Sequence, residues 1–383
     1  MARRVAAALA TLALVAAGSA LAAEDAAAAK APREFFGVVP VLTPEGAEYA
    51  QMASMGVGTM RILVSWPAHE PGPGDYKWEG LDRAVASAAA HGIRVFPTIY
   101  GTPGWVNLFD GRANCGPGCA PRSSAGLAAF ANFMRALVQR YGPGGDFWSP
   151  SGGGCVLPPL CPYEGAACNC EKPLPIRSWQ LWNEQNSPKY FGPTPNPVDY
   201  AKLVGAAAGA IRSVDPKAEI VLGGMWGPMD TDAVIPTPRF LKRFYSVPGI
   251  EATFDAIAIH PYAPNMSGVK DQLKRARDTV RKAGDRKVGL WITELGWASA
   301  GPKSQGLVKT PNGQARMLDK SFRFILKKRR AWRIRGVTWF SWRDASNKHS
   351  DCAWCARAGL QTKTGAPKPS GRAFKKLALR YGR

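Results

Sequence analysis

The chain has 383 residues, of which 46% are hydrophobic and 20% charged, and its formal net charge is +22. A chain of this length can bury a large core, and because α/β barrels often exceed about 250 residues as one unit, the length does not require several domains. The excess of basic residues favours anionic surroundings such as acidic cell-wall polymers. None of the recognised nucleic-acid-binding motifs is present, which argues against a nucleic-acid partner.

The first 22 residues have the features of an export signal. Two arginines precede an apolar stretch at residues 5–17, and Ala-Leu-Ala at residues 20–22 fits a small-x-small cleavage site. The stretch is short for a membrane span, so an uncleaved anchor is the weaker interpretation. We therefore predict a secreted or extracytoplasmic protein, with a signal peptide at residues 1–22, a disordered Ala-rich lead-in at residues 23–33, and no stable membrane insertion after cleavage.

The cysteines agree with export. The chain has eight, and an even number in an exported protein is typical of disulfides. The spacing predicts two local pairs, Cys115 with Cys119 and Cys352 with Cys355. The other four lie in one insertion before the fourth predicted strand, at about residues 143–176, where pairing among themselves is favoured over zinc because no histidine lies nearby. These four are Cys155, Cys161, Cys168 and Cys170.

Eight short, mostly apolar runs predict β-strands. Continuous apolar runs are expected for strands that are buried on both faces of a parallel sheet. Amphipathic stretches with helical spacing separate them, for example at residues 127–138, where Ser123 or Ser124 is a suitable N-cap. Eight strand–helix repeats predict an α/β fold, a (β/α)8 TIM barrel that forms one catalytic domain over residues 34–383. The predicted strands are residues 36–39, 60–66, 94–100, 178–182, 220–224, 256–261, 288–293 and 336–342.

An open, doubly wound sheet is the alternative arrangement. Such a sheet usually has a Gly-rich phosphate-binding turn after its first strand, whereas this chain continues with Val-Val-Pro-Val at residues 38–41. The barrel is therefore the better interpretation. The long insertion enters the fourth strand from its N-terminal side, which places it at the bottom of the barrel, where a stapled structural loop is favoured over a role at the substrate rim.

Two of the predicted strands run into a carboxylate, the fourth into Glu184 and the seventh into Glu294. Active sites of these barrels lie at the C-terminal ends of the strands, where a buried strand has no structural reason to end on Glu. Glycosidic cleavage needs two carboxylates, and in retaining enzymes they lie about 5–5.5 Å apart. We expect a raised pKa for Glu184, which must hold a proton, and hydrogen-bond donors or a cation beside Glu294, which must be ionised.

The residues around these glutamates resemble glycoside hydrolase clan A, the retaining (β/α)8 enzymes, and are most similar to families 39 and 5. Residues 182–184 (Trp-Asn-Glu) are similar to the acid/base motif of the clan, and residues 293–297 (Thr-Glu-Leu-Gly-Trp) to its nucleophile strand. Over about residues 34–383, similar segments also follow the second, third and sixth strands. They are Glu70-Pro71, Gly101-Thr102-Pro103-Gly104-Trp105 and His260-Pro261-Tyr262.

The resemblance implies that Glu184 is the acid/base and Glu294 the nucleophile of a double displacement on a β-glycosidic bond. It also implies that Asn183 binds the sugar 2-hydroxyl. The chain departs from the clan at Gln185, where a proline often follows the acid/base residue. That proline shapes a loop and transfers no proton, so the departure concerns the leaving-group subsite and not the mechanism.

Four further side chains receive binding roles from the resemblance. Tyr262 would hydrogen-bond the nucleophile, and Arg61 would keep it ionised. His260 would line the site beside Tyr262, and Trp342 would form the floor of the sugar subsite by stacking. Each has a structural alternative: Arg61 as an ion-pair partner within the barrel, His260 as a buried structural residue, and Trp342 as a cap on the core.

Several alternatives for the function stay open. A catalytically weak or inactive relative could bind cell-wall polymers through its basic surface, although the retained pair of glutamates counts against it. A transglycosylase would differ only in the acceptor of the intermediate. A metal-dependent hydrolase is disfavoured because the four histidines show no ligand spacing. We therefore predict an oligo- or polysaccharide substrate, with no cofactor and no metal. The histidines are His69, His91, His260 and His349.

Overall fold

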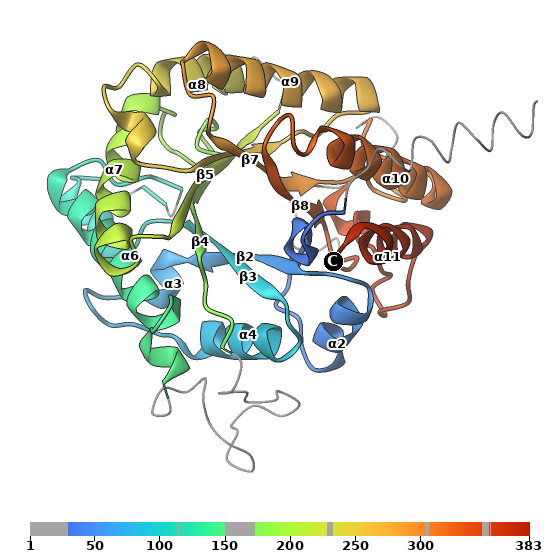
Figure 1. Ribbon diagram of the computed structural model, residues 1–383. Coiled ribbons are helices and arrows are strands. Elements are labelled where there is room, and N and C mark those ends of the chain that lie inside the picture. Colours follow the sequence, from blue (N-terminus) through green and yellow to red (C-terminus); the bar gives the residue numbers. More distant parts are fainter. Residues whose placement is uncertain are drawn as a thin grey trace, which may run out of the picture.

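The computed structural model describes residues 30–112, 115–116, 118–149, 173–227, 233–302, 306–346, 352 and 354–383. Its strands form one closed, parallel, eight-stranded barrel in sequence order, and β1 pairs with β8 to close the ring (Figure 1). This confirms the predicted (β/α)8 fold. The strands are β1 (Phe36–Val39), β2 (Thr59–Ser65), β3 (Arg94–Tyr100), β4 (Ser178–Asn183), β5 (Glu219–Trp226), β6 (Ala256–His260), β7 (Gly289–Leu295) and β8 (Ile334–Phe340).

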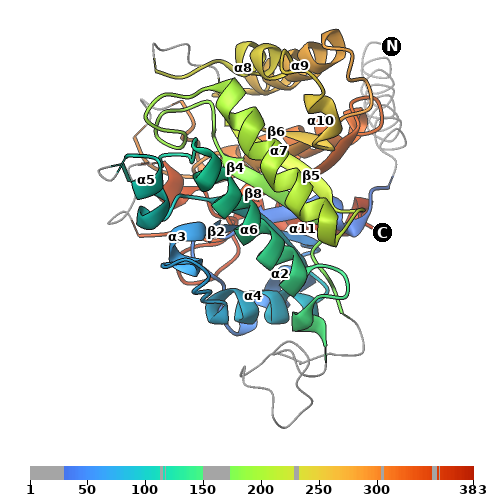
Figure 2. The same ribbon diagram turned by 90° about the vertical axis from the view of Figure 1, so that its left-hand side faces the viewer.

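Helices surround the barrel, and Figure 2 shows α6 and α7 packed side by side along its outer face. Helix α6 begins after Ser123, whose Oγ accepts a hydrogen bond from the backbone N–H of Gly126 (3.0 Å), so Ser123 is the predicted N-cap. The helices are α2 (Ala47–Ser54), α3 (Trp66–His69), α4 (Glu79–Ala90), α5 (Gly104–Phe109), α6 (Ser124–Tyr141), α7 (Pro197–Val214), α8 (Thr237–Phe244), α9 (Met266–Lys282), α10 (Pro311–Lys328) and α11 (Pro369–Tyr381).

An aromatic pair helps to fill the barrel interior. Phe96 on β3 and Trp291 on β7 are both buried, and their ring centroids lie 4.6 Å apart. Gly336 on β8 makes room for this pair, because a Cβ there would lie 2.2 Å from the Trp291 ring. The interior is therefore a packed core, and ligands have access to the barrel only from its two ends.

The N-terminal segment is ordered slightly earlier than predicted. The backbone N–H of Ala31 donates to the Tyr381 carbonyl (2.8 Å), and the N–H of Arg33 donates to the Arg383 carbonyl (3.1 Å). These bonds attach the start of the described chain to the end of α11, so the predicted disordered lead-in does not extend to residue 33. Residues 1–29, with the predicted signal peptide, lie outside the described residues.

The structure forms the two predicted local disulfides, Cys115–Cys119 and Cys352–Cys355. Residues 150–172, which contain the other four cysteines, lie outside the described residues, so the prediction for their pairing is untested. In the part of the chain that the structure describes, no helix combines the length and the apolar character needed to cross a bilayer.

Candidate active site

Two carboxylates meet at the C-terminal end of the barrel. Glu184 directly follows β4, and Glu294 is the next-to-last residue of β7. One carboxylate oxygen of each glutamate and one ring nitrogen of His260 all lie within 4.8 Å of one another. The two carboxylate side chains are only 13% and 14% exposed. Closure of the barrel therefore brings together three of the residues that sequence reasoning selected.

The backbone turns sharply as it leaves β4. Trp182 and Glu184 have φ values of 75° and 42°, in the left-handed region that residues with side chains seldom adopt. The turn is held by the Glu184 N–H, which donates to the Gly224 carbonyl on β5 (3.0 Å), and by the buried Trp182, whose indole donates to the Tyr190 carbonyl. This turn directs the Glu184 carboxyl group toward His260 and Glu294.

Arg61 connects three strands through one guanidinium group. Its Nη1 donates to Glu294 Oε1 (2.7 Å), its Nη2 to Asn183 Oδ1 (2.9 Å) and its Nε to Gln180 Oε1 (2.8 Å). The side chain is 5% exposed, so its charge is compensated mainly by Glu294. Because Asn183 Oδ1 accepts from Arg61, the amide NH2 of Asn183 is the part of its side chain that can donate to a ligand.

Glu294 accepts hydrogen bonds at both oxygens, because the Tyr262 hydroxyl donates to Oε2 (2.8 Å) while Arg61 binds Oε1. Burial acts to raise the pKa of Glu294, but nearby His260 and Arg61 and the donors Tyr262 and Arg61 together outweigh it and lower the pKa below the ordinary value. Burial and the adjacent carboxylate raise the pKa of Tyr262 well above its ordinary value, so Tyr262 stays a neutral donor.

Glu184 titrates in the opposite direction. Its burial and the negative charge of Glu294 raise its pKa, and these effects exceed the opposing hydrogen bond from His260. Two chemically identical side chains therefore differ in their protonation: Glu184 favours the neutral acid and Glu294 the carboxylate. Such a pair can supply one proton donor and one anion to the same bond.

A hydrogen-bonded chain orients His260. Its Nδ1 lies 2.9 Å from Glu184 Oε1, and its Nε2 lies 3.1 Å from Thr293 Oγ1. Since Arg61 can only donate, Gln180 Oε1 must face Arg61, and Gln180 Nε2 donates to Thr293 Oγ1 (3.3 Å). The Thr293 hydroxyl therefore connects Gln180 to one ring nitrogen of His260, and the other ring nitrogen contacts Glu184.

Sequence reasoning missed three residues that position His260: Gln180, Thr293 and Gly224. A Cβ at Gly224 on β5 would lie 2.0 Å from His260 Nε2, so only glycine leaves room for the ring. Gln180 is fully buried in a strand whose other buried side chains are mostly apolar, and this isolated polar residue is the signal that could have identified it.

Trp342 does not lie with the glutamates. It is 1% exposed, and its indole N–H donates to Glu48 Oε1 in α2 (3.0 Å). The interpretation of Trp342 as a core cap is therefore correct, and the predicted stacking floor is not, because a buried indole offers no face to a sugar. Strand β8 ends at Phe340, and Phe340 and Trp354 pack on Tyr262 instead, with ring centroids 6.4 and 5.0 Å away.

The loop after Glu184 is held without the proline of the clan. Gln185 is fully buried, and its Nε2 donates to the Gly223 carbonyl (3.0 Å). Asn186 donates to the carbonyls of Trp226 and Ile235 (2.8 and 2.9 Å). Side-chain amides thus attach this loop to the end of β5. Glu184 therefore keeps a defined position although Gln185 replaces the proline that often follows the acid/base residue in the clan.

The three central side chains do not suit a metal ion. Glu184, His260 and Glu294 are the set of His, Cys, Asp or Glu residues that the described part of the chain brings within ligating distance of one another. The guanidinium of Arg61 already lies 2.7 Å from Glu294 and would repel a divalent cation. The donor set therefore fits proton transfer and nucleophilic chemistry better than metal binding.

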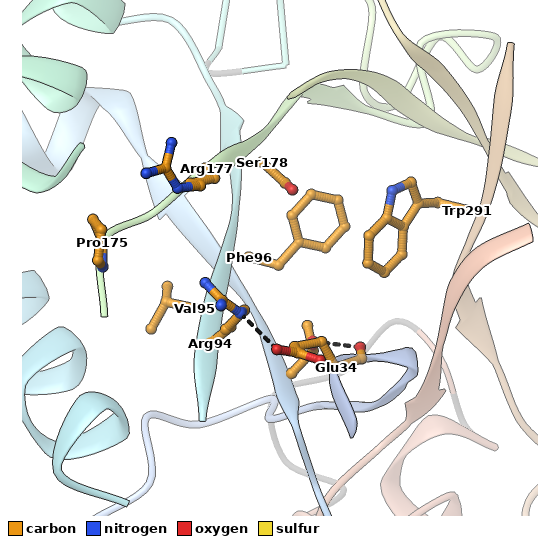
Figure 3. Close-up of a pocket in the computed structure, with 9 residues that line it drawn as sticks. Glu34, Arg94, Val95, Phe96, Pro175, Arg177, Ser178 and Trp291 are labelled. Atoms are coloured by element: carbon orange, nitrogen blue, oxygen red, sulfur yellow. Dashed lines mark hydrogen bonds and ion pairs between the residues drawn. The ribbon is translucent and has the colours of Figure 1, made fainter. Parts of the chain in front are cut away.

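A different cavity, of about 280 Å³, opens at the opposite, N-terminal end of the barrel (Figure 3). Phe96 and Trp291 line it together with Arg94 and Glu34, which form an ion pair (3.0 Å). Glu34 neutralises Arg94, Arg177 is the other charged residue of the lining, and the cavity lies at the end of the barrel that conventionally serves stability. We therefore assign the candidate active site to the glutamate end.

Comparison with protein families agrees with this geometry. A model described as glycosyl hydrolase catalytic core matches residues 211–374, and a beta-galactosidase model, that of glycosyl hydrolase family 42, matches residues 45–106. Both models describe glycosyl hydrolases, so the chain is similar to these enzymes in both segments. The first match includes Glu294, His260 and Tyr262, and the second includes Arg61.

Curated relatives match a shorter stretch of this chain. A probable glucan 1,3-beta-glucosidase A of Aspergillus terreus is 34% identical over 105 residues, and a glucan 1,3-beta-glucosidase of Blumeria graminis is 31% identical over 103 residues. Each match covers 26% of this chain, and it spans only 24% of the relative's length.

Solved structures share the fold over most of the chain. A family 39 glycoside hydrolase from Bacteroides cellulosilyticus has a TM-score of 0.63 at 19% identity, covering 91% of this chain and 63% of its own. A GH5_18 enzyme from Bifidobacterium longum has a TM-score of 0.60 at 18% identity, covering 90% and 79%. A monomeric beta-xylosidase from Caulobacter crescentus scores 0.55 at 17% identity, covering 91% and 69%. The fold is thus that of clan A glycosidases, as the sequence predicts.

Proposed function

We propose that this protein is a retaining β-glycosidase in which Glu184 is the acid/base and Glu294 the nucleophile. The observation that carries the proposal is a pair of carboxylates with oxygens within 4.8 Å and pKa values shifted in opposite directions. Inverting enzymes need about 6.5–9.5 Å between their carboxyl groups to hold a water molecule, whereas retaining enzymes use about 5–5.5 Å. The short separation supports direct attack by Glu294.

In the first step, Glu294 attacks the anomeric carbon while Glu184 gives its proton to the departing glycosidic oxygen. The bond from carbon to the leaving oxygen breaks, and an ester between the sugar and Glu294 forms. The Asn183 amide is placed to donate to the sugar 2-hydroxyl, because Arg61 occupies its oxygen. Arg61 and Tyr262 hold Glu294 ionised and oriented before the attack.

In the second step, Glu184 accepts a proton from water as the water oxygen attacks the anomeric carbon, and Glu294 leaves as a carboxylate. The same neighbours explain this change of role. The charge of Glu294 helps to raise the pKa of Glu184, and that charge disappears while Glu294 is esterified. The pKa of Glu184 then falls, and its carboxylate form is available as a base.

The substrate class follows from the relatives and the charge. The named curated relatives are glucan 1,3-beta-glucosidases, so β-linked glucans are the first substrates to test. A net charge of +22 adds affinity for anionic wall polymers. The predicted signal and the two disulfides support action outside the cytoplasm. We include β-glucosides, β-xylosides and β-galactosides in the panel.

The test compares the wild type with Glu294→Gln on aryl β-glycosides and β-glycans. We expect turnover on one sugar class, a loss of about 10⁴-fold or more in Glu294→Gln, and a first product with retained anomeric configuration by NMR. Glu219→Gln, the same change at the other end of the barrel, is the control and should keep activity. If both the wild type and Glu294→Gln bind a polymer equally and neither turns over, a carbohydrate-binding function replaces the proposal.

A further inference from the structure

Two neighbouring connections at the N-terminal end of the barrel are strongly basic. Helices α9 and α10 lie side by side, and each is followed by a turn that leads into a strand, α9 into β7 and α10 into β8 (Figure 1). Four of the seven residues at 281–287 are basic and one is acidic, and six of the nine residues at 327–335 are basic and none is acidic. Part of the positive charge of the chain is therefore gathered at the end of the barrel opposite the two glutamates.

Exposed cations of both connections make up one surface, which we call the basic ridge. The connections are in contact, because the Leu290 N–H in β7 donates to the Arg333 carbonyl (3.1 Å). Arg277, which is buried in α9, donates to the Arg286 carbonyl (2.8 Å) and so attaches the first connection to its helix. The side chains of the basic ridge are Arg281, Lys282, Arg286, Lys287, Arg330 and Arg333.

The basic ridge lacks compensating anions. Within the part of the chain that the structure describes, none of its six side chains lies at ion-pair distance from a carboxylate. The adjacent carboxylates are engaged elsewhere: Asp278 pairs with Lys274 (2.7 Å), and Asp285 accepts from the Tyr245 hydroxyl (2.9 Å) and the Val288 N–H (3.0 Å). The charges of the ridge are therefore available to an external anion.

Like charges crowd one another across the two connections. Burial lowers the pKa of Arg277, and the positive charges of Arg281 and Arg333 lower it further. These two residues come from different connections, so both connections act on the same buried guanidinium. An anionic ligand would relieve this repulsion.

The basic ridge is not part of the active site. Gly289 begins β7 and Glu294 lies five residues later, which at about 3.3 Å per residue separates them by about 16 Å. A ligand on the ridge therefore leaves both glutamates open. The ridge spans two connections, so it suits a long ligand that repeats its negative charge.

We propose that the basic ridge binds an anionic polysaccharide through its carboxylates and holds the protein on that polymer, with the active site at the opposite end of the barrel. Guanidinium groups bind carboxylates through two parallel hydrogen bonds, and four of the six ridge residues are arginines. The inference goes beyond the proposed glycosidase function and does not depend on it, because the net charge alone does not say where an anionic polymer binds.

Two observations favour a polysaccharide over a membrane surface. Trp332 follows Arg330 closely in the chain, packs edge to face on Phe324 (5.6 Å between centroids) and is partly exposed, so it offers an indole on which a sugar ring can pack. Neither connection exposes a large apolar side chain of the kind that inserts into a bilayer.

The test measures binding to polygalacturonate, which carries one carboxylate on each sugar, by affinity electrophoresis at about 0.1 M salt. The ridge variant replaces four exposed cations by glutamine: Arg286→Gln, Lys287→Gln, Arg330→Gln and Arg333→Gln. The control variant removes the same charge from exposed positions on or before α11: Lys363→Gln, Arg372→Gln, Lys375→Gln and Lys376→Gln. We expect the ridge variant to bind about tenfold or more weakly, because four exposed charge contacts of about twofold each multiply to that order. The control variant should keep most of the affinity, and both variants should keep the wild-type melting temperature and kcat/KM on a small aryl glycoside.

A second variant separates a polysaccharide from other anions. Trp332→Ala keeps every charge, and it should bind polygalacturonate about threefold or more weakly while its binding to phosphatidylglycerol vesicles is unchanged. An unchanged affinity of Trp332→Ala for polygalacturonate would overturn the assignment to a sugar polymer, and tighter binding of the wild type to the vesicles would assign the ridge to a membrane surface instead.

Two further results would overturn the inference. One is the absence of binding between the wild type and polygalacturonate. The other is an equal loss of affinity in the ridge and control variants, because the field of the whole protein would then attract the polymer. All these outcomes are read from binding, so they stand whether or not the protein turns over a glycoside.

Discussion

The most informative single substitution is Arg61→Met, because Arg61 is the one guanidinium that contacts Glu294 directly among the described residues. Methionine keeps much of the side-chain volume and removes the charge and three donors. Glu294 then retains the hydrogen bond from Tyr262 and the proximity of His260. Since Arg61 lowers the pKa of Glu294, its removal raises that pKa, and a larger fraction of Glu294 is protonated in mildly acidic solution.

The size of the effect follows from the geometry. Two unit charges 2.7 Å apart attract by about 6 kcal/mol at an effective dielectric constant of about 20, which is an upper limit because both groups lose hydration on burial. Removal of one partner of a buried pair costs about 3–5 kcal/mol. If about 3 kcal/mol of this cost appears in the transition state, kcat/KM falls by about 10²-fold.

The assay is a pH profile of kcat/KM, read at its acid limb, which reports ionisation of the nucleophile in the free enzyme. We expect the acid limb of Arg61→Met to move to higher pH. Arg140→Met is the matched control, because Arg140 forms a similar ion pair with Asp82 away from the glutamates. It should lower the melting temperature and leave the acid limb in place. An unmoved acid limb in Arg61→Met would refute the electrostatic argument, and Arg61 would then act only by holding Asn183.

Three further predictions concern the other half of the site. Glu184→Gln should lose far more activity on glycosides with poor leaving groups than on dinitrophenyl glycosides, which need no proton, as measured by the dependence of kcat/KM on leaving-group pKa. The same variant should be more stable above the ordinary pKa of Glu in thermal or denaturant unfolding, because a raised folded-state pKa makes the ionised carboxylate destabilising at neutral pH. Gly224→Ala should reduce kcat/KM by about 10²-fold by displacing His260, whereas Gly205→Ala, in open space on α7, should be neutral or slightly stabilising.

The strands were predictable because strands buried on both faces carry a direct signal in the sequence. The predicted run at residues 94–100 coincides with β3, and the predicted end of the fourth strand differs from that of β4 by one residue. The error at the eighth strand has a physical reason. The apolar run continues through Trp342, but β8 ends at Phe340, because the next backbone N–H, that of Ser341, donates to the Ala358 carbonyl (3.3 Å) outside the barrel strands.

The site was predictable only where a residue is rare at its position. A glutamate at the end of an apolar strand stands out, as do the polar residues of the His260-Pro261-Tyr262 segment. Trp354 carries no such signal, because a tryptophan in a loop is common, and only the folded disulfide loop places it beside Tyr262. The same limit applies to Trp342, whose residue type fits a sugar platform and whose burial excludes it.

The opposite pKa shifts of the two glutamates arise from a network that is complete without substrate. Arg61, Gln180 and Thr293 connect β2, β4 and β7, and each donor fixes the orientation of the next group as far as His260. In a buried network of this kind, every unsatisfied group is costly, so a change at Gln180 disturbs Arg61 and Thr293 together. The asymmetry between Glu184 and Glu294 is therefore built by the barrel before any sugar binds, and the substrate needs only to enter a site in which acid and nucleophile are already distinct.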